Sequence, residues 1–336
     1  MQRVSNTSTL VSFAQNREDV VLWRALMAVP NGRYVDVGAN QPGSDSVSRA
    51  FYDRGWRGIA VEPVPALAEA FAAERPRDVV VQAAITDADV ETVTLHAIAE
   101  TGLSSISDEV GDRHRASGLP VEEVQVPAKR LDAVLDMAGW DDVDIHFLVV
   151  DVEGAEAAVL RSLDLSTWKP WVVVVESTSP RETRQTHGEW EQLLTDAGYR
   201  FCLFDGLSRF YASPEHPELT ASLSYPACPH DDYILLSTVR DHEQIQGLEA
   251  RIAGLDESVQ SLTQERDDRS AELTALTVRW RTAALSRWAD ASVVNHDHSA
   301  DLGRIDALQK ELMATKRTVS WRVTAPLRAA RKLTRP

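Results

Sequence analysis

Short apolar runs separated by helical patterns cover the first two-thirds of the chain. The runs lie at 33–37, 58–61, 79–83, 147–150, 172–175, 201–204 and 233–236. Most are continuous rather than alternating, which is typical of parallel strands buried on both faces. Apolar residues with helical spacing predict helices at 11–29, 46–54, 66–74, 131–137, 155–162 and 188–197. The alternation predicts an open, mostly parallel seven-stranded sheet with helices on both faces.

The last two apolar runs favour a different pairing. Runs 201–204 and 233–236 are candidates for an antiparallel hairpin at the sheet edge. The connection between them contains four prolines: Pro214, Pro217, Pro226 and Pro229. We therefore expect that connection to be mostly loop.

Beyond about residue 239 the apolar residues follow a heptad pattern. They recur with spacings of three and four at Ile245, Leu248, Ile252, Leu255, Val259, Leu262, Leu273 and Leu276. Arg266 and Arg269 occupy the same seam. This pattern predicts a coiled coil. The alternative, a single amphipathic helix packed on the domain, is disfavoured because the seam is only two positions wide.

The heptad pattern sets the predicted domain organisation. A break is expected at 289–303, and a second short heptad run follows at Ile305, Leu308 and Leu312. We therefore predict a catalytic-type domain over 1–240, a coiled-coil helix over 241–288, a linker over 289–303 and a helical basic tail over 304–336.

Charge separates the C-terminal tail from the rest. The chain carries a net charge of −16, which argues against non-specific binding to nucleic acid. Residues 316–336, by contrast, contain seven basic side chains and no acidic one. The segment 320–333 is basic and amphipathic, so a helix there could lie on an anionic membrane surface. A solvated basic tail, interrupted at Pro326, is the alternative.

The remaining composition favours a cytoplasmic protein, with membrane association only through the tail. Hydrophobic residues make up 43% of the chain, enough for a real core. Two cysteines do not form a disulfide framework. The N-terminus lacks the apolar segment of a signal peptide, and no window approaches the roughly 18 apolar residues of a spanning helix.

The loop after the first strand has the features of a cofactor site. Gly38 allows the backbone to approach a ligand closely, and Gly43 opens the next turn. Dinucleotide binding would require the spacing G-x-G-x-x-G, which is absent. Asp36 would repel a pyrophosphate but suits a cationic sulfonium. The loop therefore favours S-adenosyl-L-methionine over NAD.

Two further positions extend the predicted cofactor site. Glu62 ends the second strand, 24 residues after Gly38, where an acid can accept both hydroxyls of a ribose. Ala84, near the end of the third strand, leaves room for an adenine ring, although alanines there are usually packing residues.

Three motifs together resemble the FkbM family of methyltransferases. They are D-V-G-A-N at Asp36–Asn40, V-E-P at Val61–Pro63 and D-V-E-G-A-E at Asp151–Glu156. The segment Ala14–Asp19 also resembles that family, whereas Gln41-Pro42-Gly43 departs from its pattern. The resemblance covers roughly residues 11–240. It implies a Rossmann-like class I methyltransferase fold, S-adenosyl-L-methionine as cofactor with Asn40 in its loop, and O-methylation of sugars or other natural products.

Methyl transfer to a hydroxyl needs a positioned acceptor and a route for its proton. The candidate catalytic residues are Asp151, Glu176 and His230. Asp151 is also a candidate cofactor contact, whereas Glu156 suits the first turn of a helix. A divalent metal bound by Asp151 with the cluster His230–Asp232 is an open alternative, as is a simple turn there. Residues 100–125 are expected to form a lid or acceptor loop.

Two main interpretations of function follow. The first is an S-adenosyl-L-methionine-dependent O-methyltransferase that acts on a sugar hydroxyl of a cell-surface glycan, a glycolipid or a small-molecule acceptor, and forms a homo-oligomer through the coiled coil. The second is a non-catalytic Rossmann scaffold with a coiled-coil and membrane-surface module. An NAD-dependent oxidoreductase is disfavoured by the loop spacing.

Overall fold

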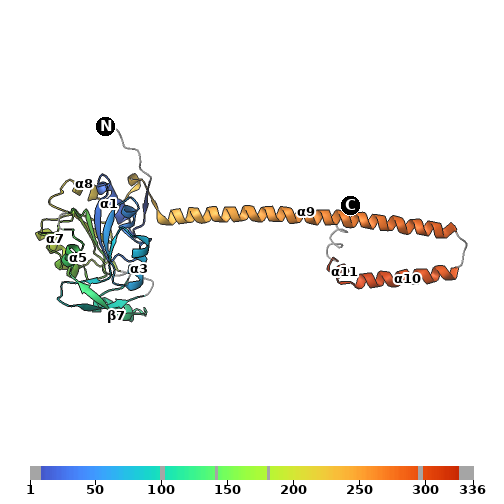
Figure 1. Ribbon diagram of the computed structural model, residues 1–336, viewed down its shortest axis with the longest axis horizontal. Helices are drawn as coiled ribbons and strands as arrows, with labels where there is room; N and C mark the ends of the chain where they lie inside the picture. The colour runs from blue at the N-terminus through green and yellow to red at the C-terminus, as the bar shows by residue number, and fades with distance from the viewer. Residues whose placement is uncertain (1–8, 99–102, 141–142, 180–181, 294–297, 325–336) are drawn as a thin grey trace, which may run out of the picture. The chain divides into compact units, whose positions relative to one another are not determined.

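The computed structural model describes residues 9–98, 103–140, 143–179, 182–293 and 298–324 (Figure 1). The chain divides into two units, residues 1–246 and 247–336. The first unit is an α/β domain, and the second is helical.

A seven-stranded sheet forms the centre of the first unit. Its strands lie in the order β10 (Arg200–Phe204), β11 (Ser208–Ala212), β9 (Val172–Glu176), β8 (Phe147–Val150), β2 (Arg33–Val37), β3 (Arg57–Val61) and β4 (Val79–Val81). All neighbours are parallel except β11, which runs antiparallel to both β9 and β10. The chain builds outward from β2 to β4, then returns to β8 on the other side of β2. The strand order therefore reverses between β2 and β8, where ligands bind in sheets of this type.

Helices cover both faces of this sheet, as predicted (Figure 1). One face packs against α5 (Leu131–Met137), α6 (Glu156–Arg161) and α7 (Glu191–Asp196). The other packs against α1 (Glu18–Leu26), α2 (Arg49–Tyr52), α3 (Pro65–Glu74) and α8 (Leu219–Leu223). Because both faces are covered, the inner strands β2, β3, β8 and β9 are buried on both sides, which accounts for their continuous apolar runs.

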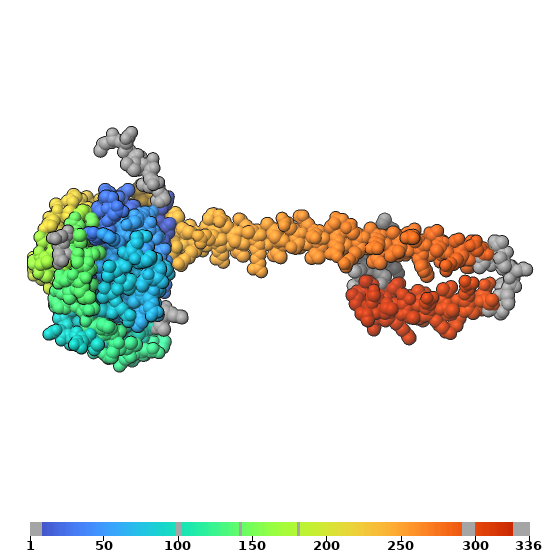
Figure 2. Space-filling model, in the orientation of Figure 1, coloured from blue at the N-terminus to red at the C-terminus, as the bar shows by residue number. Residues whose placement is uncertain are grey.

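Two smaller sheets were not predicted. The first contains β5 (Ala84–Ile85), β7 (Glu122–Lys129) and β6 (Thr92–Ala97), and it lies at the lower end of the globular unit (Figures 1 and 2). Helix α4 (Asp108–Ala116) is inserted between β6 and β7, so the expected loop at 100–125 contains a helix and the start of a strand. The second sheet pairs β1 (Leu10–Ser12) with β12 (Tyr233–Leu235) in parallel.

The structure corrects the predicted sheet edge. Runs 201–204 and 233–236 do not form a hairpin, because β10 pairs with β11 and β12 pairs with β1. The backbone N–H groups of Leu207 and Ser208 donate to Asp205 Oδ1 at 2.9 and 2.8 Å, which closes a tight turn between β10 and β11. The connection 205–232 is mostly loop, as expected, but it also contains β11, α8 and the short 3-10 helix η2 (Pro229–Asp231), which were not predicted.

Two predicted helices are shorter than expected. The helix predicted over 11–29 begins only at Glu18, because residues 10–12 form β1 and Asp19 accepts hydrogen bonds from Ser12 Oγ and the backbone N–H of Phe13. The helix predicted over 46–54 is reduced to α2, since Ser46 and Ser48 bind a buried arginine. Another 3-10 helix, η1 (His187–Glu189), precedes α7.

The second unit consists of most of α9 (Leu236–Val293), α10 (His298–Arg317) and α11 (Val319–Val323). Helix α9 crosses the predicted domain boundary at residue 240, and helix is present through 293 and again from 298, positions for which we predicted a linker. None of the described helices is both long enough and apolar enough to cross a membrane. Most of the predicted membrane-contacting segment lies at 325–336, outside the described residues, so that contact stays a prediction.

Candidate active site

A pocket lies at the carboxyl ends of β2, β3 and β8, where the strand order reverses. Five of the six predicted cofactor-site residues line it: Gly38, Asn40, Glu62, Ala84 and Asp151. The other lining residues are Val37, Val61, Pro63, Val64, Leu67, Ala83, Ile85, Leu95, Ser104, Ile106 and Val152.

Gly38 is required where β2 and β8 end side by side. Its φ is +85°, in the left-handed region, and a Cβ at this position would lie 1.7 Å from the backbone oxygen of Asp151. No side chain fits there. The backbone N–H of Gly38 donates to the carbonyl oxygen of Val61 at 3.0 Å, which ties the loop to the end of β3. The glycine therefore brings three strand ends together around the pocket.

Glu62 is held at the pocket wall by backbone donors. The N–H of Asn40 donates to Glu62 Oε2 at 2.9 Å, and the N–H of Val64 donates to Oε1 at 2.8 Å. Burial raises the pKa of Glu62 to about 7. Each oxygen can accept a second hydrogen bond, so the carboxylate is placed to bind a pair of ligand hydroxyls.

An apolar wall faces this carboxylate. Ala84 and Ile85 come from β5, Leu95 from β6, and Ile106 from the segment before α4. Sequence reasoning found Ala84 and placed Ser104 and Ile106 in the expected acceptor loop over 100–125, but it missed Leu95, because the three-stranded sheet was not predicted. The alternation of Thr92–Ala97 was the signal that could have indicated a strand there.

A carboxylate cluster lies beside the pocket. Asp151, Glu153 and Glu176 each place a carboxylate oxygen within 4.8 Å of the others. Asp151 and Glu153 follow β8, and Glu176 ends β9. The turn that presents them is unusual, since Glu153 and Gly154 have φ values of +53° and +100°. Ser105 Oγ donates to the backbone oxygen of Glu153 at 2.6 Å and supports this turn.

Burial and mutual repulsion keep protons in this cluster. Burial raises the pKa of Asp151, while a hydrogen bond from Glu176 lowers it in part. Burial and the negative charges of Asp151 and Glu153 raise the pKa of Glu176 far above its usual range. Glu176 therefore holds a proton at neutral pH and donates it to Asp151. Such a cluster can exchange protons with a ligand or, alternatively, surround a divalent cation.

The cluster has unused hydrogen-bonding capacity. Glu153 Oε2 and Glu176 Oε2 are buried and have no hydrogen-bond partner among the described residues. Buried polar atoms without partners are rare in proteins. Glu156 differs, because its Oε1 accepts the backbone N–H of Gly154 at 2.8 Å, at the start of α6. This contact agrees with the expected role of Glu156 in the first helical turn.

Asp36 does not line the pocket. It alternates with Val35 and Val37 along β2 and so faces the α2 and α3 side, where Ser48 Oγ donates to its Oδ2 at 2.5 Å. Burial raises the pKa of Asp36 to about 6. The expectation that this carboxylate faces a cationic cofactor is therefore corrected.

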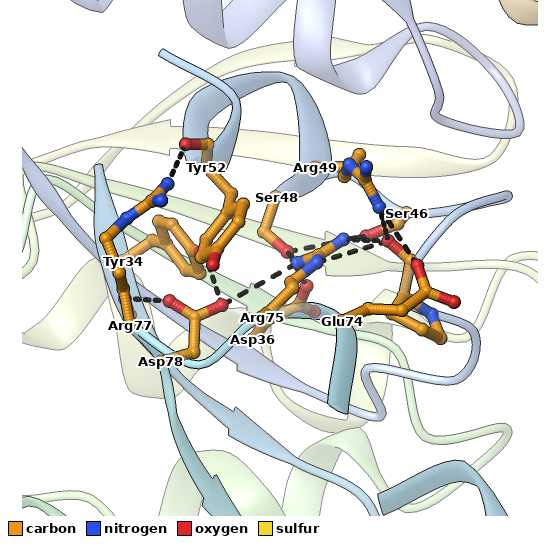
Figure 3. Close-up of polar contacts among 12 residues, drawn as sticks. Tyr34, Asp36, Ser46, Ser48, Arg49, Tyr52, Glu74, Arg75, Arg77 and Asp78 are labelled. Carbon is orange, nitrogen blue, oxygen red and sulfur yellow. Dashed lines mark hydrogen bonds and ion pairs between the residues drawn. The ribbon is translucent and has the colours of Figure 1, made fainter. Parts of the chain in front are cut away.

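Arg75 links Asp36 to the cofactor loop, and sequence reasoning missed it. This fully buried arginine directly follows α3 and donates to the carbonyl oxygen of Pro42, to Ser46 Oγ at 2.7 Å and to Ser48 Oγ at 2.8 Å (Figure 3). Its Nη1 also lies 3.9 Å from Asp78 Oδ2. In the sequence, an arginine among charged residues at a helix end is typical of a solvated position. Here it fixes the loop over 42–48.

His230 does not join the cluster. It is exposed on η2, and the adjacent Asp231 forms an ion pair with Arg24 at 3.0 Å. The predicted metal site combining this segment with Asp151 is not assembled. Among the described residues, His146 packs against Trp171 with ring centroids 4.4 Å apart, and no histidine lines the pocket.

Comparisons with known proteins agree with this geometry. Residues 36–201 match the family model described as methyltransferase FkbM domain. No curated protein matches the chain in sequence. The match confirms the resemblance drawn from the three motifs and, with it, S-adenosyl-L-methionine as the cofactor of the family.

Several solved methyltransferase structures are similar at low identity. A TehB-like SAM-dependent methyltransferase from Corynebacterium glutamicum is 11% identical, covers 58% of this chain and 87% of its own, and has a TM-score of 0.30. Precorrin-6y C5,15-methyltransferase from Geobacter metallireducens is 14% identical, with coverages of 63% and 97% and a TM-score of 0.31. Aeropyrum pernix fibrillarin, with natively bound S-adenosyl-L-methionine, is 13% identical, with coverages of 63% and 84% and a TM-score of 0.30. The fold class follows from the strand order rather than from these likenesses.

Proposed function

Because the chain belongs to the FkbM methyltransferase family, we propose that it transfers a methyl group from S-adenosyl-L-methionine to a hydroxyl of a polyhydroxylated acceptor, such as a sugar of a surface glycan or glycolipid. The observation that carries this proposal is the cluster of one buried and two half-buried carboxylates, Glu176, Asp151 and Glu153, beside the cofactor pocket.

The pocket residues suit the cofactor. Glu62 has two oxygens, each with one backbone donor and room for a ribose hydroxyl. Leu95 and Ile106 offer an apolar surface for the adenine ring. When bound, S-adenosyl-L-methionine supplies an electrophilic methyl group on a sulfonium.

The carboxylates suit a hydroxyl acceptor. The unpartnered oxygens of Glu153 and Glu176 are hydrogen-bond acceptors that acceptor hydroxyls can satisfy. Asp151 lines the pocket and accepts a hydrogen bond from the protonated Glu176. In this assignment Asp151 takes the proton of the attacking hydroxyl as its oxygen gains the methyl group. Glu176, itself protonated, orients Asp151 and limits its negative charge.

The charge of the chain narrows the class of acceptor and indicates a location. The acidic surface disfavours nucleic acid as an acceptor. We further propose a cytoplasmic enzyme whose basic tail contacts the membrane where glycolipid acceptors are assembled. This location rests on the charge separation of the tail alone.

Methyl transfer from labelled S-adenosyl-L-methionine tests the proposal. The acceptors would be extracted surface polysaccharides and glycolipids, with protein, nucleic acid and small-molecule fractions as comparisons. Label recovered as O-methyl sugars after acid hydrolysis would support the proposal. Cofactor binding with no transfer to any fraction would favour the non-catalytic scaffold, and label on carbon would exclude O-methylation.

Replacing each acid by its amide separates the two catalytic roles. We expect Asp151→Asn to lower the rate of transfer at saturating cofactor about 10²–10⁴-fold, the usual contribution of a general base. Glu176→Gln should keep activity within about tenfold, because Gln, like the protonated Glu176, donates to Asp151. Rates at saturating cofactor, with binding measured by calorimetry, check both variants.

Two outcomes would overturn this assignment. Activity retained by Asp151→Asn but lost in Glu176→Gln would exchange the roles of the two residues. Activity that requires added Mg²⁺ and is lost with chelator would mean that the cluster surrounds a cation rather than protons.

A further inference from the structure

The apolar seam of α9 is left uncovered by the described chain. The side chains of Ile245, Leu248, Ile252, Leu255, Val259 and Leu262 are 51–65% exposed. We propose that this seam pairs with the same seam of a second copy in a parallel, in-register, two-stranded coiled coil. This proposal is independent of the methyltransferase function.

The chain's own α10 cannot cover these residues. From Leu262 to the end of α9 at Val293 the helix runs for about 47 Å, at about 1.5 Å per residue. Leu312, the last heptad residue of α10, lies about 21 Å from the start of that helix. Even a fully extended connection from Val293 to His298 adds only about 17 Å. The connection and the α10 seam together therefore span less than the distance from Val293 back to Leu262. The other five residues of the α9 seam lie farther from Val293 still.

The choice of apolar residues favours two parallel strands. The spacings of three and four place Ile245, Ile252 and Val259 at heptad position a, and Leu248, Leu255 and Leu262 at position d. β-branched residues at a with leucine at d favour parallel dimers, whereas other combinations favour trimers or tetramers.

The flanking charges agree with this orientation. In a parallel dimer Arg251, at position g, lies beside the partner's Asp256, at position e, and this pair occurs twice by symmetry. The parallel arrangement therefore places opposite charges beside each other.

Arg266 and Arg269 interrupt the seam at positions a and d. On its own helix, Arg269 binds Glu265 at 2.6 Å and Arg266 binds Asp267 at 2.8 Å. These pairs reduce the repulsion between facing arginines. A polar layer at a seam position fixes register at some expense of stability, so the arginines also oppose slipped pairings.

The mass of the full chain in solution tests the dimer. We expect twice the chain mass of 37.2 kDa by light scattering across a dilution series. Leu255→Glu should raise the dissociation constant at least tenfold. Ala250→Glu is the matched control, because it adds the same charge at the outer position f and should leave the dimer intact.

Single cysteines test the orientation. Under mild oxidation Leu255→Cys should form a cross-linked dimer, since parallel pairing places each new thiol opposite its own copy. Ala250→Cys should not cross-link, and the wild-type chain reports any background from Cys202 and Cys228.

Several outcomes would overturn the proposal. A monomeric wild-type chain would exclude pairing, and a threefold or fourfold mass would exclude two strands. Cross-linking of Leu255→Cys only when Arg266→Cys is also present would show antiparallel pairing of the seam 245–276. Leu255→Glu should still bind S-adenosyl-L-methionine. A failure of the dimer proposal can therefore be distinguished from a failure of the proposed methyl transfer.

Discussion

Single residues away from the pocket hold its loops in position. The guanidinium of Arg75 reaches three groups of the segment 42–48 and lies between the carboxylates of Asp36 and Asp78 (Figure 3). This segment directly follows Asn40, whose backbone N–H orients Glu62. The contacts form a continuous path from a buried arginine to the carboxylate that we assign to ribose binding. Arg75 is therefore a positioning residue.

Arg75→Lys should weaken cofactor binding. Lysine keeps the charge but cannot make the divergent hydrogen bonds of a guanidinium. Losing one or two such bonds, at about 1 kcal/mol each, predicts a roughly tenfold higher dissociation constant for S-adenosyl-L-methionine. The rate at saturating cofactor should change little. Calorimetry well below the melting temperature measures the affinity of the folded protein.

Arg77→Lys is the matched control for that experiment. Arg77 is close to Arg75 in sequence but donates to the backbone oxygen of Tyr52, outside the segment 42–48. Its replacement should leave cofactor affinity unchanged. Equal effects of the two substitutions, or none from Arg75→Lys, would limit Arg75 to a stabilising role.

At the scale of elements, one short sheet and one long helix extend the basic fold. The sheet of β5, β6 and β7 supplies much of the apolar pocket wall, including Leu95. Helix α9 begins directly after β12, which pairs with β1. The proposed coiled coil and the catalytic domain are therefore connected without an intervening loop in the sequence.

Replacing the two seam arginines should strengthen the proposed coiled coil. Arg266→Leu with Arg269→Leu converts two charged layers into apolar ones, so we expect a dimer dissociation constant at least tenfold lower. Helix melting followed by circular dichroism and sedimentation would measure the change. Arg281→Leu, at the outer position b, should have no such effect. Weaker association of the double variant would mean that the arginines stabilise the pair.

For the whole molecule, an unusual number of acids are buried in the globular unit. Burial, together with the charge of Asp205, raises the pKa of Glu18 to about 8, and burial raises those of Asp19 and Glu156 to about 6 and 7. Between about pH 4.5 and 8 the folded state thus binds more protons than the unfolded state. Stability should therefore fall as the pH rises through this range.

Glu18→Gln tests this linkage. At pH 8 the amide removes the cost of a buried carboxylate while keeping an acceptor for the backbone N–H of Asn16. We expect stabilisation on the order of 2 kcal/mol at pH 8, a rise in melting temperature of roughly 5 °C, and a smaller effect at pH 5. Melting temperatures across this pH range would measure it. Glu69→Gln, an exposed change in α3, should be neutral at both values.

The strands of the main sheet and the cofactor residues were largely predicted from the sequence, whereas β11 and the short sheet of β5, β6 and β7 were not. Six of the seven strands of the main sheet were predicted close to their observed positions, because each has an apolar run. In the four inner ones, β2, β3, β8 and β9, this run reflects burial on both faces. The seventh strand, β11, was missed because no apolar run marks it. One of its partners, β10, is joined to it by a tight turn, and the other, β9, is distant in sequence. The short sheet was missed for the same reason. Most of the predicted cofactor residues line the pocket, because strand ends in such a sheet share one edge.

The sequence by itself determined the periodic and local features of this protein. Apolar periodicity specified the layers and the seam of α9, and the glycine spacing after β2 excluded a dinucleotide loop. Only the tertiary structure decided which distant side chains meet. It turned Asp36 toward Arg75, left His230 on the surface and brought Glu153 and Glu176 beside Asp151. The physical reason is that local pattern fixes the face on which a residue lies, whereas its neighbours depend on strand order and on long-range packing.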